Sequence, residues 1–184
     1  DDPPSINDWV EVISKKLIKE CNKRKLDLPR LICEPGRSIV SSAGITLYKI
    51  GSQKNVPGIR KYISIDGGMS DNPRPITYQS LYHACLVDRA LEDSEEIVTI
   101  AGKHCESGDV LMKDFPLPKV KSEEILGVFG TGAYNFSMSS NYNRIPRPAG
   151  VIVFEGHSEI IHRRETSEDL LRLDVLPDRF MSVR

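Results

Sequence analysis

The spacing of apolar residues changes near residue 43, and this change constrains the fold more than any other feature of the chain. Before it, apolar side chains recur at helical spacing, at Ile6, Trp9, Val10, Ile13, Leu17 and Cys21. Ser5-Ile6-Asn7-Asp8, at the start of this pattern, has the form of a capping box. After residue 43, short apolar runs alternate with glycine and proline. We therefore expect one amphipathic helix first and short strands afterwards.

A short apolar run, Leu31-Ile32-Cys33, follows the helix and is typical of a buried strand. It ends in Glu34-Pro35-Gly36-Arg37. In parallel α/β folds the carboxyl ends of strands carry the chemistry. Glycine lets the backbone approach a phosphate, and arginine can bind an anion through two hydrogen bonds. The alternative interpretation is an ordinary tight turn with a surface ion pair.

The second part of the chain has the pattern of an antiparallel β domain. A loop over 51–60 separates its first two strands, a short helix is expected over 167–173, and the tail at 176–184 has little structural signal. The predicted strands cover residues 45–50, 62–65, 95–101, 110–112, 125–129, 151–154 and 159–162.

Composition excludes several classes of protein. A net charge of -1 gives no strong attraction to nucleic acid or to an anionic membrane. No apolar run approaches the ~20 residues that span a bilayer, and the first residues lack the features of a signal peptide. The chain does not begin with Met, so we expect a processed or partial sequence. Its four cysteines have neither zinc-site nor disulfide spacing, which predicts no metal and a reducing compartment.

Residues 102–109, here called the thiol loop, place a thiol beside a carboxylate between two glycines. Cys105 lies next to Lys103 and His104, which is a setting in which a thiol proton can be moved. Glu106 can hold a cation. The alternative is that Cys105 is a small buried apolar residue and that Glu106 is a solvated charge.

Two further stretches combine turn residues with functional side chains. Residues 66–75 are too rich in glycine, proline and aspartate for a strand, and they hold Arg74 between two prolines. Asp66, Asp71 and Asn72 are interpreted as caps of this turn. In the other stretch, glycines precede Tyr134, so that the backbone can approach a ligand while the phenol donates to it. A strand-end turn with a core tyrosine is the alternative.

Four motifs together resemble diaminopimelate decarboxylase in order and spacing, over residues 29–175. They are Glu34-Pro35-Gly36-Arg37; Asp66-Gly67-Gly68-Met69 with Arg74-Pro75 and Tyr78; Cys105-Glu106-Ser107 with Asp109; and Gly132-Ala133-Tyr134 with Tyr142-Asn143-Arg144. The resemblance implies a pyridoxal-phosphate decarboxylase of the alanine racemase fold, a (β/α)8 barrel followed by a β domain, working as a homodimer with shared active sites.

This resemblance also implies how the chain is divided. Residues 1–43 would be the last βα unit of the barrel, and residues 44–184 a C-terminal antiparallel β-barrel or sandwich domain that contributes the thiol loop and the dimer interface. The Schiff-base lysine and the glycine-rich phosphate loop of the family have no counterpart in this sequence. The isolated chain is therefore expected to be inactive.

The resemblance assigns four residues to the cofactor, pyridoxal 5'-phosphate. Glu34 corresponds to the partner of the pyridinium nitrogen, and a carboxylate there keeps the ring protonated as an electron sink. Gly36 and Arg37 resemble the phosphate-binding turn. Tyr134 resembles the tyrosine that contacts the cofactor. Arg37 and Tyr134 are also expected near the substrate.

The same resemblance assigns the remaining residues to the substrate. Arg74 and Tyr78 would bind the distal carboxylate of diaminopimelate, and Glu106 its distal ammonium. Cys105 would be the catalytic proton donor, delivered into the barrel of the partner subunit. A thiol suits this role because it is mostly protonated at neutral pH.

The sequence leaves three possible functions, and charge distinguishes the first two. The first is the decarboxylation of meso-2,6-diaminopimelate to L-lysine and carbon dioxide, the last step of lysine biosynthesis. The second is an ornithine- or arginine-type decarboxylase of the same fold, in which a bare distal amine would leave Arg74 unpaired. The third is a non-catalytic homologue that binds a true decarboxylase. The expected location is the cytoplasm, or the stroma of a plastid.

Overall fold

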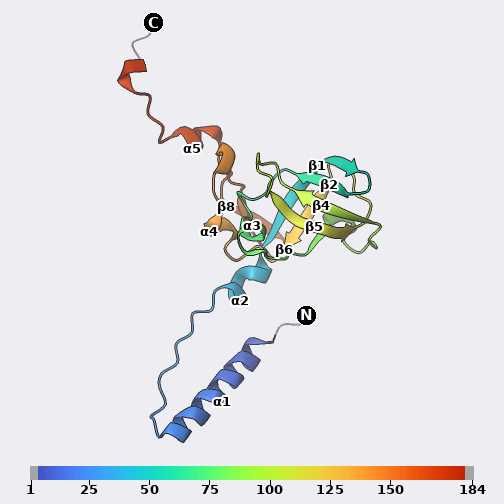
Figure 1. The fold of residues 1–184 in the computed structure, drawn as a ribbon. Coiled ribbons are helices and arrows are strands. Elements are labelled where there is room, and N and C mark those ends of the chain that lie inside the picture. The colour runs from blue at the N-terminus through green and yellow to red at the C-terminus, as the bar shows by residue number, and fades with distance from the viewer. Residues whose placement is uncertain (1–3, 181–184) are drawn as a thin grey trace. The chain divides into compact units, whose positions relative to one another are not determined.

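The computed structural model describes residues 4–180, and these divide into two compact units, one ending at Pro35 and the other beginning at Gly36. The first unit contains helix α1 (Ile6–Arg24), coloured blue in Figure 1. The predicted capping box is confirmed, because the Ser5 hydroxyl accepts from the Asp8 N–H and the Asp8 carboxylate accepts from the Ser5 N–H. Lys25 ends the helix in the left-handed conformation.

The predicted buried strand at Leu31-Ile32-Cys33 is wrong. These residues are irregular and exposed, with 51% of Leu31 and 71% of Ile32 accessible to solvent. An apolar run forms a buried strand only where neighbouring strands pair with its backbone. No strand among residues 4–180 pairs with this run. Its assignment to a barrel, together with the 1–43 and 44–184 division, stays a prediction.

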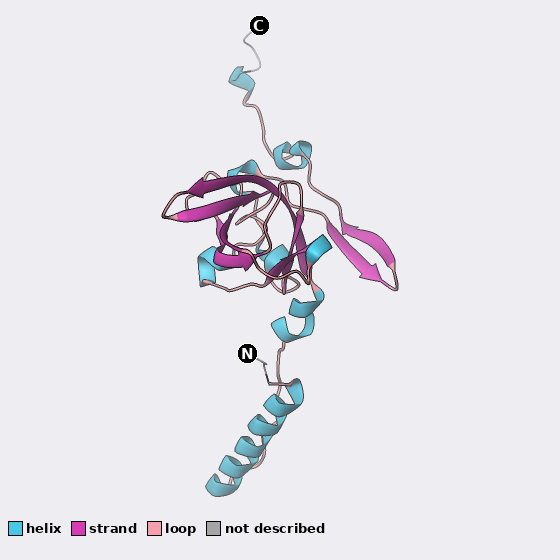
Figure 2. Ribbon diagram, turned by 90° about the vertical axis from the view of Figure 1, so that its right-hand side faces the viewer, coloured by secondary structure: helices cyan, strands magenta, loops and turns pink. Residues whose placement is uncertain are grey.

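The second unit is built on one curved six-stranded sheet, shown in magenta in Figure 2, and a separate two-stranded hairpin. The order of the strands in the sheet is β3-β6-β1-β2-β4-β5. Their bounds are β1 (Ile45–Val56), β2 (Arg60–Ile65), β3 (Ala84–Leu86), β4 (Glu96–Ala101), β5 (Val110–Leu117) and β6 (Ile125–Phe129). The hairpin consists of β7 (Gly150–Phe154) and β8 (His157–His162).

The sheet is mixed, which corrects the antiparallel prediction. Strands β2 and β4 run parallel, with Ile63 opposite Ile100, while the other pairs are antiparallel. Parallel neighbours require a crossover connection. Here residues 66–95 form it, and they include α3 and β3.

The predicted loop at 51–60 is shorter than expected. Strand β1 continues to Val56, past a register shift between Ile50 and Gln53.

The core lies inside the curve of the sheet. In β1 and β2 alternate residues are buried, Tyr48 with Ile50 and Ile63 with Ile65, as the period of a strand requires. The largest fully buried side chains include Ile50 of β1, Ile63 of β2, Ile100 of β4 and Leu126 of β6. The prediction of a strand at each of these places is confirmed. Strand β3 and the short helices other than α5 were not predicted.

Short helices connect the strands and place the side chains of the site. They are α2 (Arg37–Val40), η1 (Ser41–Ala43), α3 (Arg74–Tyr78), η2 (Val87–Arg89), α4 (Asn135–Met138), η3 (Tyr142–Arg144), α5 (Ser167–Leu171) and η4 (Asp178–Phe180). Helix α5 confirms the predicted terminal helix, and the last four residues of the predicted weak tail, 181–184, lie outside the described residues. Within the described part, no helix combines the length and the apolar character needed to cross a membrane.

Candidate functional site

Two arginines and two tyrosines from distant parts of the chain form the arginine–tyrosine cluster: Arg37, Arg74, Tyr78 and Tyr134. The Arg74 guanidinium lies 5.0 Å from the centroid of the Tyr78 ring and 5.2 Å from that of Tyr134. The Arg37 guanidinium lies 5.5 Å from the Tyr134 ring. These distances are within the range of cation–π attraction. The sequence predicted these residues for one site, and the structure brings them together.

Short elements hold the cluster in place. Arg74 is the first residue of α3, Arg37 is the first of α2, and Tyr134 caps α4 in the left-handed conformation at φ 71°. Gly132 lies against α2 so closely that a Cβ there would stand 1.9 Å from the Val40 carbonyl oxygen. Only glycine therefore lets the Tyr134 segment approach the Arg37 segment.

Arg74 forms no ion pair with any residue of the described part of the chain, 4–180. Its Nε atom is buried and has no hydrogen-bond partner among the described residues. The two terminal nitrogens make only long contacts, 3.5 Å to the Ser80 hydroxyl and 4.0 Å to the Met138 sulfur. A buried charged donor left unsatisfied is costly, and a carboxylate satisfies it through two parallel hydrogen bonds. Arg74 is thus suited to bind an anionic group from outside the chain.

The thiol loop presents both of its predicted functional groups to solvent. Cys105 and Glu106 are exposed, so the alternative that Cys105 is a buried apolar residue is wrong. The Cys105 N–H donates to Asn143 Oδ1 at 2.9 Å. Glu106 accepts from the Gly108 N–H at 3.2 Å and from the Tyr142 hydroxyl at 3.3 Å. These hydrogen bonds, the Gly108 N–H foremost, lower the pKa of Glu106 and keep its carboxylate charged at neutral pH.

The thiol loop and the arginine–tyrosine cluster adjoin each other. Helix α3, which begins with Arg74 and ends with Tyr78, packs its Ile76 side chain against the loop. A Cβ on Gly108 would stand 2.6 Å from Ile76 Cδ1. The absence of a side chain at Gly108 therefore lets helix α3, which begins with the cationic Arg74, lie against the loop that carries the anionic Glu106.

The turn at residues 66–75 is capped largely as predicted. Asp66 accepts from the Lys49 N–H, and Asp71 accepts from the Gly68 N–H, both at 2.8 Å. Asp71 also accepts from the Tyr48 hydroxyl. Burial raises the pKa of Asp71 above its usual range. Asn72 departs from the prediction, since its buried side-chain amide has no hydrogen-bond partner among residues 4–180.

Glu34 was assigned a role from the sequence, whereas His104 was not. Glu34 lies in the first unit, where its side chain is exposed, and its predicted place beside a cofactor ring stays a prediction. His104 was given no role, yet it is buried and pairs with Asp109. No spacing rule predicts such a pair, because its two members meet only when the thiol loop folds back on itself.

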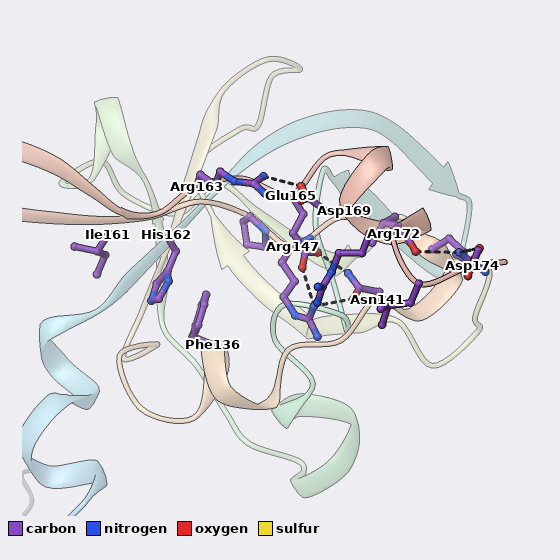
Figure 3. Close-up of a pocket in the computed structure, with 14 residues that line it drawn as sticks. Phe136, Asn141, Arg147, Ile161, His162, Arg163, Glu165, Asp169, Arg172 and Asp174 are labelled. Atoms are coloured by element: carbon purple, nitrogen blue, oxygen red, sulfur yellow. Dashed lines mark hydrogen bonds and ion pairs between the residues drawn. The ribbon is translucent and has the colours of Figure 1, made fainter.

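A cavity of about 850 Å³ lies beside the hairpin, between β8, α4 and α5 (Figure 3). Three ion pairs lie in its lining: Arg147 with Glu165 at 2.9 Å, Arg144 with Asp174 at 2.9 Å, and Arg163 with Asp169. None of the site residues expected from the sequence lines it. We therefore place the candidate site at the thiol loop and the arginine–tyrosine cluster. Among residues 4–180, no three His, Cys, Asp or Glu side chains are grouped to hold a metal ion.

Comparison with known proteins links this geometry to a family. The family model described as the pyridoxal-dependent decarboxylase C-terminal sheet domain matches residues 10–132. Diaminopimelate decarboxylase of Synechocystis sp. is 55% identical over 99% of this chain, and that of Bacillus subtilis is 49% identical over 95%. The chain spans only 39% and 40% of the lengths of these two relatives.

A solved structure gives the same result. The crystal structure of diaminopimelate decarboxylase from M. jannaschii in complex with L-lysine superposes on 97% of this chain with a TM-score of 0.88 and 37% sequence identity. The chain covers 40% of that structure. Both the sequence and the fold of the described residues are therefore those of the C-terminal part of longer proteins.

Proposed function

We propose a function from one premise: this chain belongs to the pyridoxal-dependent decarboxylases, of which it carries the C-terminal sheet domain. The full-length protein, of which the chain is the C-terminal portion, decarboxylates meso-2,6-diaminopimelate to L-lysine and carbon dioxide. This is the last step of lysine biosynthesis. The relatives named diaminopimelate decarboxylase support the choice of substrate, as does the L-lysine in the M. jannaschii complex.

The observation that carries this proposal is the pair of opposite charges on one surface. The distal end of diaminopimelate is an amino-acid head group with one ammonium and one carboxylate. Arg74 lacks an anionic partner among the described residues, and Glu106 is held in its charged form. Arg74 with Tyr78 binds the distal carboxylate, and Glu106 binds the distal ammonium.

The residues present fit an anionic cofactor. Gly36 has no side chain at a point where a Cβ would stand 3.2 Å from the Tyr134 hydroxyl, and Arg37 supplies a cation beside the same ring. Gly36, Arg37 and Tyr134 would hold the phosphate of pyridoxal 5'-phosphate, and the resemblance to the family assigns Glu34 to its ring nitrogen. When bound, this cofactor withdraws the electrons that carbon dioxide leaves behind.

Cys105 completes the reaction as the proton donor. Loss of carbon dioxide breaks a carbon–carbon bond and leaves the electron pair on the substrate carbon. The Sγ–H of Cys105 transfers its proton to that carbon, and solvent reprotonates the thiolate. Cys105 and Glu106 are exposed in this chain, which supports a homodimer in which the thiol loop enters the barrel of the partner subunit.

Two alternatives are less well supported. An ornithine- or arginine-type decarboxylase would bring a distal group without a carboxylate and leave Arg74 unpaired in the complex. A non-catalytic homologue would have no need for an exposed thiol beside a charged carboxylate. We expect the full-length enzyme in the cytoplasm or the plastid stroma, and we expect the isolated 184-residue chain to be inactive.

Removal of the cofactor tests the reaction class. The full-length protein, stripped of pyridoxal 5'-phosphate by dialysis against hydroxylamine, is expected to release no carbon dioxide from diaminopimelate, and added cofactor should restore the rate. Carbon dioxide release is measured from substrate labelled in its carboxylates, with the isolated chain as a control. A stripped protein that retains its full rate would exclude pyridoxal-dependent catalysis.

A further inference from the structure

Two buried residues of the thiol loop, His104 and Asp109, form a side-chain pair. His104, the residue immediately before Cys105, is 8% exposed, and Asp109 is 4% exposed. His104 Nδ1 lies 2.7 Å from Asp109 Oδ2. Neither side chain points to the solvent that the neighbouring Cys105 and Glu106 face. A buried polar group that loses its hydrogen-bond partner is costly, so the pair holds the two ends of the loop together.

Asp109 also ties the loop to the turn at residues 66–73. Its Oδ1 accepts from the Met69 N–H at 2.7 Å, and its Oδ2 accepts from the His104 N–H at 2.9 Å. The Lys103 N–H donates to the Gly67 carbonyl at 3.0 Å. One carboxylate thus fixes backbone groups of two separate segments.

Two glycines leave room for the Asp109 carboxylate. A Cβ on Gly102 would stand 2.0 Å from Asp109 Oδ2, and one on Gly68 would stand 2.5 Å from the carboxylate oxygens. Gly68 has φ +151°, a conformation that other residues rarely adopt. The backbone on both sides is therefore shaped around this carboxylate.

The face of the histidine ring lies against the segment that contacts Cys105 and Glu106. The Tyr142 ring is stacked on His104, with 6.1 Å between ring centroids. The Tyr142 hydroxyl donates to Glu106, and the next residue, Asn143, accepts from the Cys105 N–H. His104 thus connects Asp109 with the segment that holds both Cys105 and Glu106.

We propose that His104 and Asp109 are positioning residues that fix the direction from which the Cys105 thiol delivers its proton. This inference rests on the proposed role of Cys105. Without the pair, the thiol loop keeps its sequence but loses its anchor, and the thiol reaches the reacting carbon from more than one direction. Because small misplacements of a catalytic group cost about a hundredfold in rate, the effect should be large.

The experiment measures which face of the reacting carbon receives the proton. A residue with a merely structural role would not change this result. In D2O the bond to carbon dioxide is replaced by a bond to deuterium, and the electron pair of the broken bond forms the new one. The carbon that loses carbon dioxide then carries one hydrogen and one deuterium. A thiol held in one place delivers deuterium to one face, so the stereochemical purity of the labelled L-lysine reports its position.

The full-length enzyme is compared with three variants: His104→Leu, His104→Asn and the control His83→Leu, which alters an exposed histidine of the same domain. Asparagine can place a donor near the position of Nδ1, whereas leucine cannot. We expect His104→Leu to lower kcat about a hundredfold, to change KM far less, and to reduce the stereochemical purity. His104→Asn should recover part of both losses, and His83→Leu should match the wild type.

Asp109→Asn provides a second test in case His104→Leu does not fold, because it keeps the size of the side chain and removes its charge. It should show the same reduction in stereochemical purity. Wild-type purity in Asp109→Asn, or in a folded His104→Leu, would overturn the positioning role. Cys105→Ala separates the two proposals: if it keeps the wild-type rate and purity, the donor role of Cys105 fails first, and the inference about the pair falls with it.

Discussion

Arg74→Met in the full-length protein is expected to lower kcat/KM for diaminopimelate about a thousandfold, because the substrate loses two charge-assisted hydrogen bonds worth about 1.5–3 kcal/mol each. The Arg74 guanidinium lies 5.0 Å from the centroid of the Tyr78 ring and 5.2 Å from that of Tyr134, and its buried Nε has no partner among the described residues. Methionine fills similar space without charge. Steady-state kinetics with purified protein measure the effect.

Two controls make this result specific. Arg74→Lys keeps the charge but not the planar fork, so it should recover only part of the loss. Arg60→Met removes an arginine that pairs with Asp114 at 3.0 Å, away from the arginine–tyrosine cluster, and should leave kcat/KM unchanged. If Arg74→Met has the same kcat/KM for diaminopimelate as the wild type, Arg74 does not bind the substrate.

Cys105→Ala is expected to lower kcat about a hundredfold or more, in the range of a lost general acid. Alanine removes only the Sγ atom, which is exposed in this chain, and the Cys105 N–H keeps its bond to Asn143 because alanine has the same backbone. Cofactor content and the unfolding midpoint should therefore match those of the wild type. Single-turnover measurements of carbon dioxide release and of L-lysine formation locate the slowed step.

Cys85→Ala is the matched control for this prediction. Cys85 lies on β3, opposite Gly127 of β6, and belongs to no part of the candidate site. Its replacement also removes one thiol from the β domain, so equal losses in the two variants would indicate a general effect of the substitutions. A Cys105→Ala enzyme that forms L-lysine at the wild-type rate would remove Cys105 from the proton-donor role.

Local signals in the sequence predicted local structure well. The capping box at Ser5 and Asp8 and the apolar period after it locate α1, because a helix is specified by residues three and four positions apart. Short apolar runs bounded by turn residues, such as residues 125–129, locate strands from equally local signals. Helix α3 was missed because its Pro73-Arg74-Pro75 start has the composition of a turn, although proline is tolerated in the first turn of a helix.

Long-range pairing could not be predicted from periodicity. The parallel contact between β2 and β4 depends on a crossover, and the apolar period of a strand is the same in either orientation. At Leu31-Ile32-Cys33, by contrast, a strand was predicted that the structure does not contain. Its composition fits a buried strand, but burial also requires partner strands, and the described residues provide none.

The candidate site was predicted in part. The proximity of Arg74 and Tyr134, sixty residues apart, was expected only from the resemblance to a family, and the structure confirms it at 5.2 Å. The exposure of Cys105 resolved a choice that the sequence left open. The pairing of His104 with Asp109 had no sequence signal, since polar residues in a loop are ordinarily solvated.

Competition between two substrates tests the proposed function most directly. The full-length protein, loaded with pyridoxal 5'-phosphate, is given equal concentrations of meso-diaminopimelate and L-ornithine, and the products are quantified by mass spectrometry. The ratio of product rates equals the ratio of the two kcat/KM values. We predict that L-lysine exceeds putrescine at least about a hundredfold, because ornithine leaves Arg74 unpaired. An excess of putrescine would contradict the assignment of Arg74 and Glu106 to an amino-acid head group.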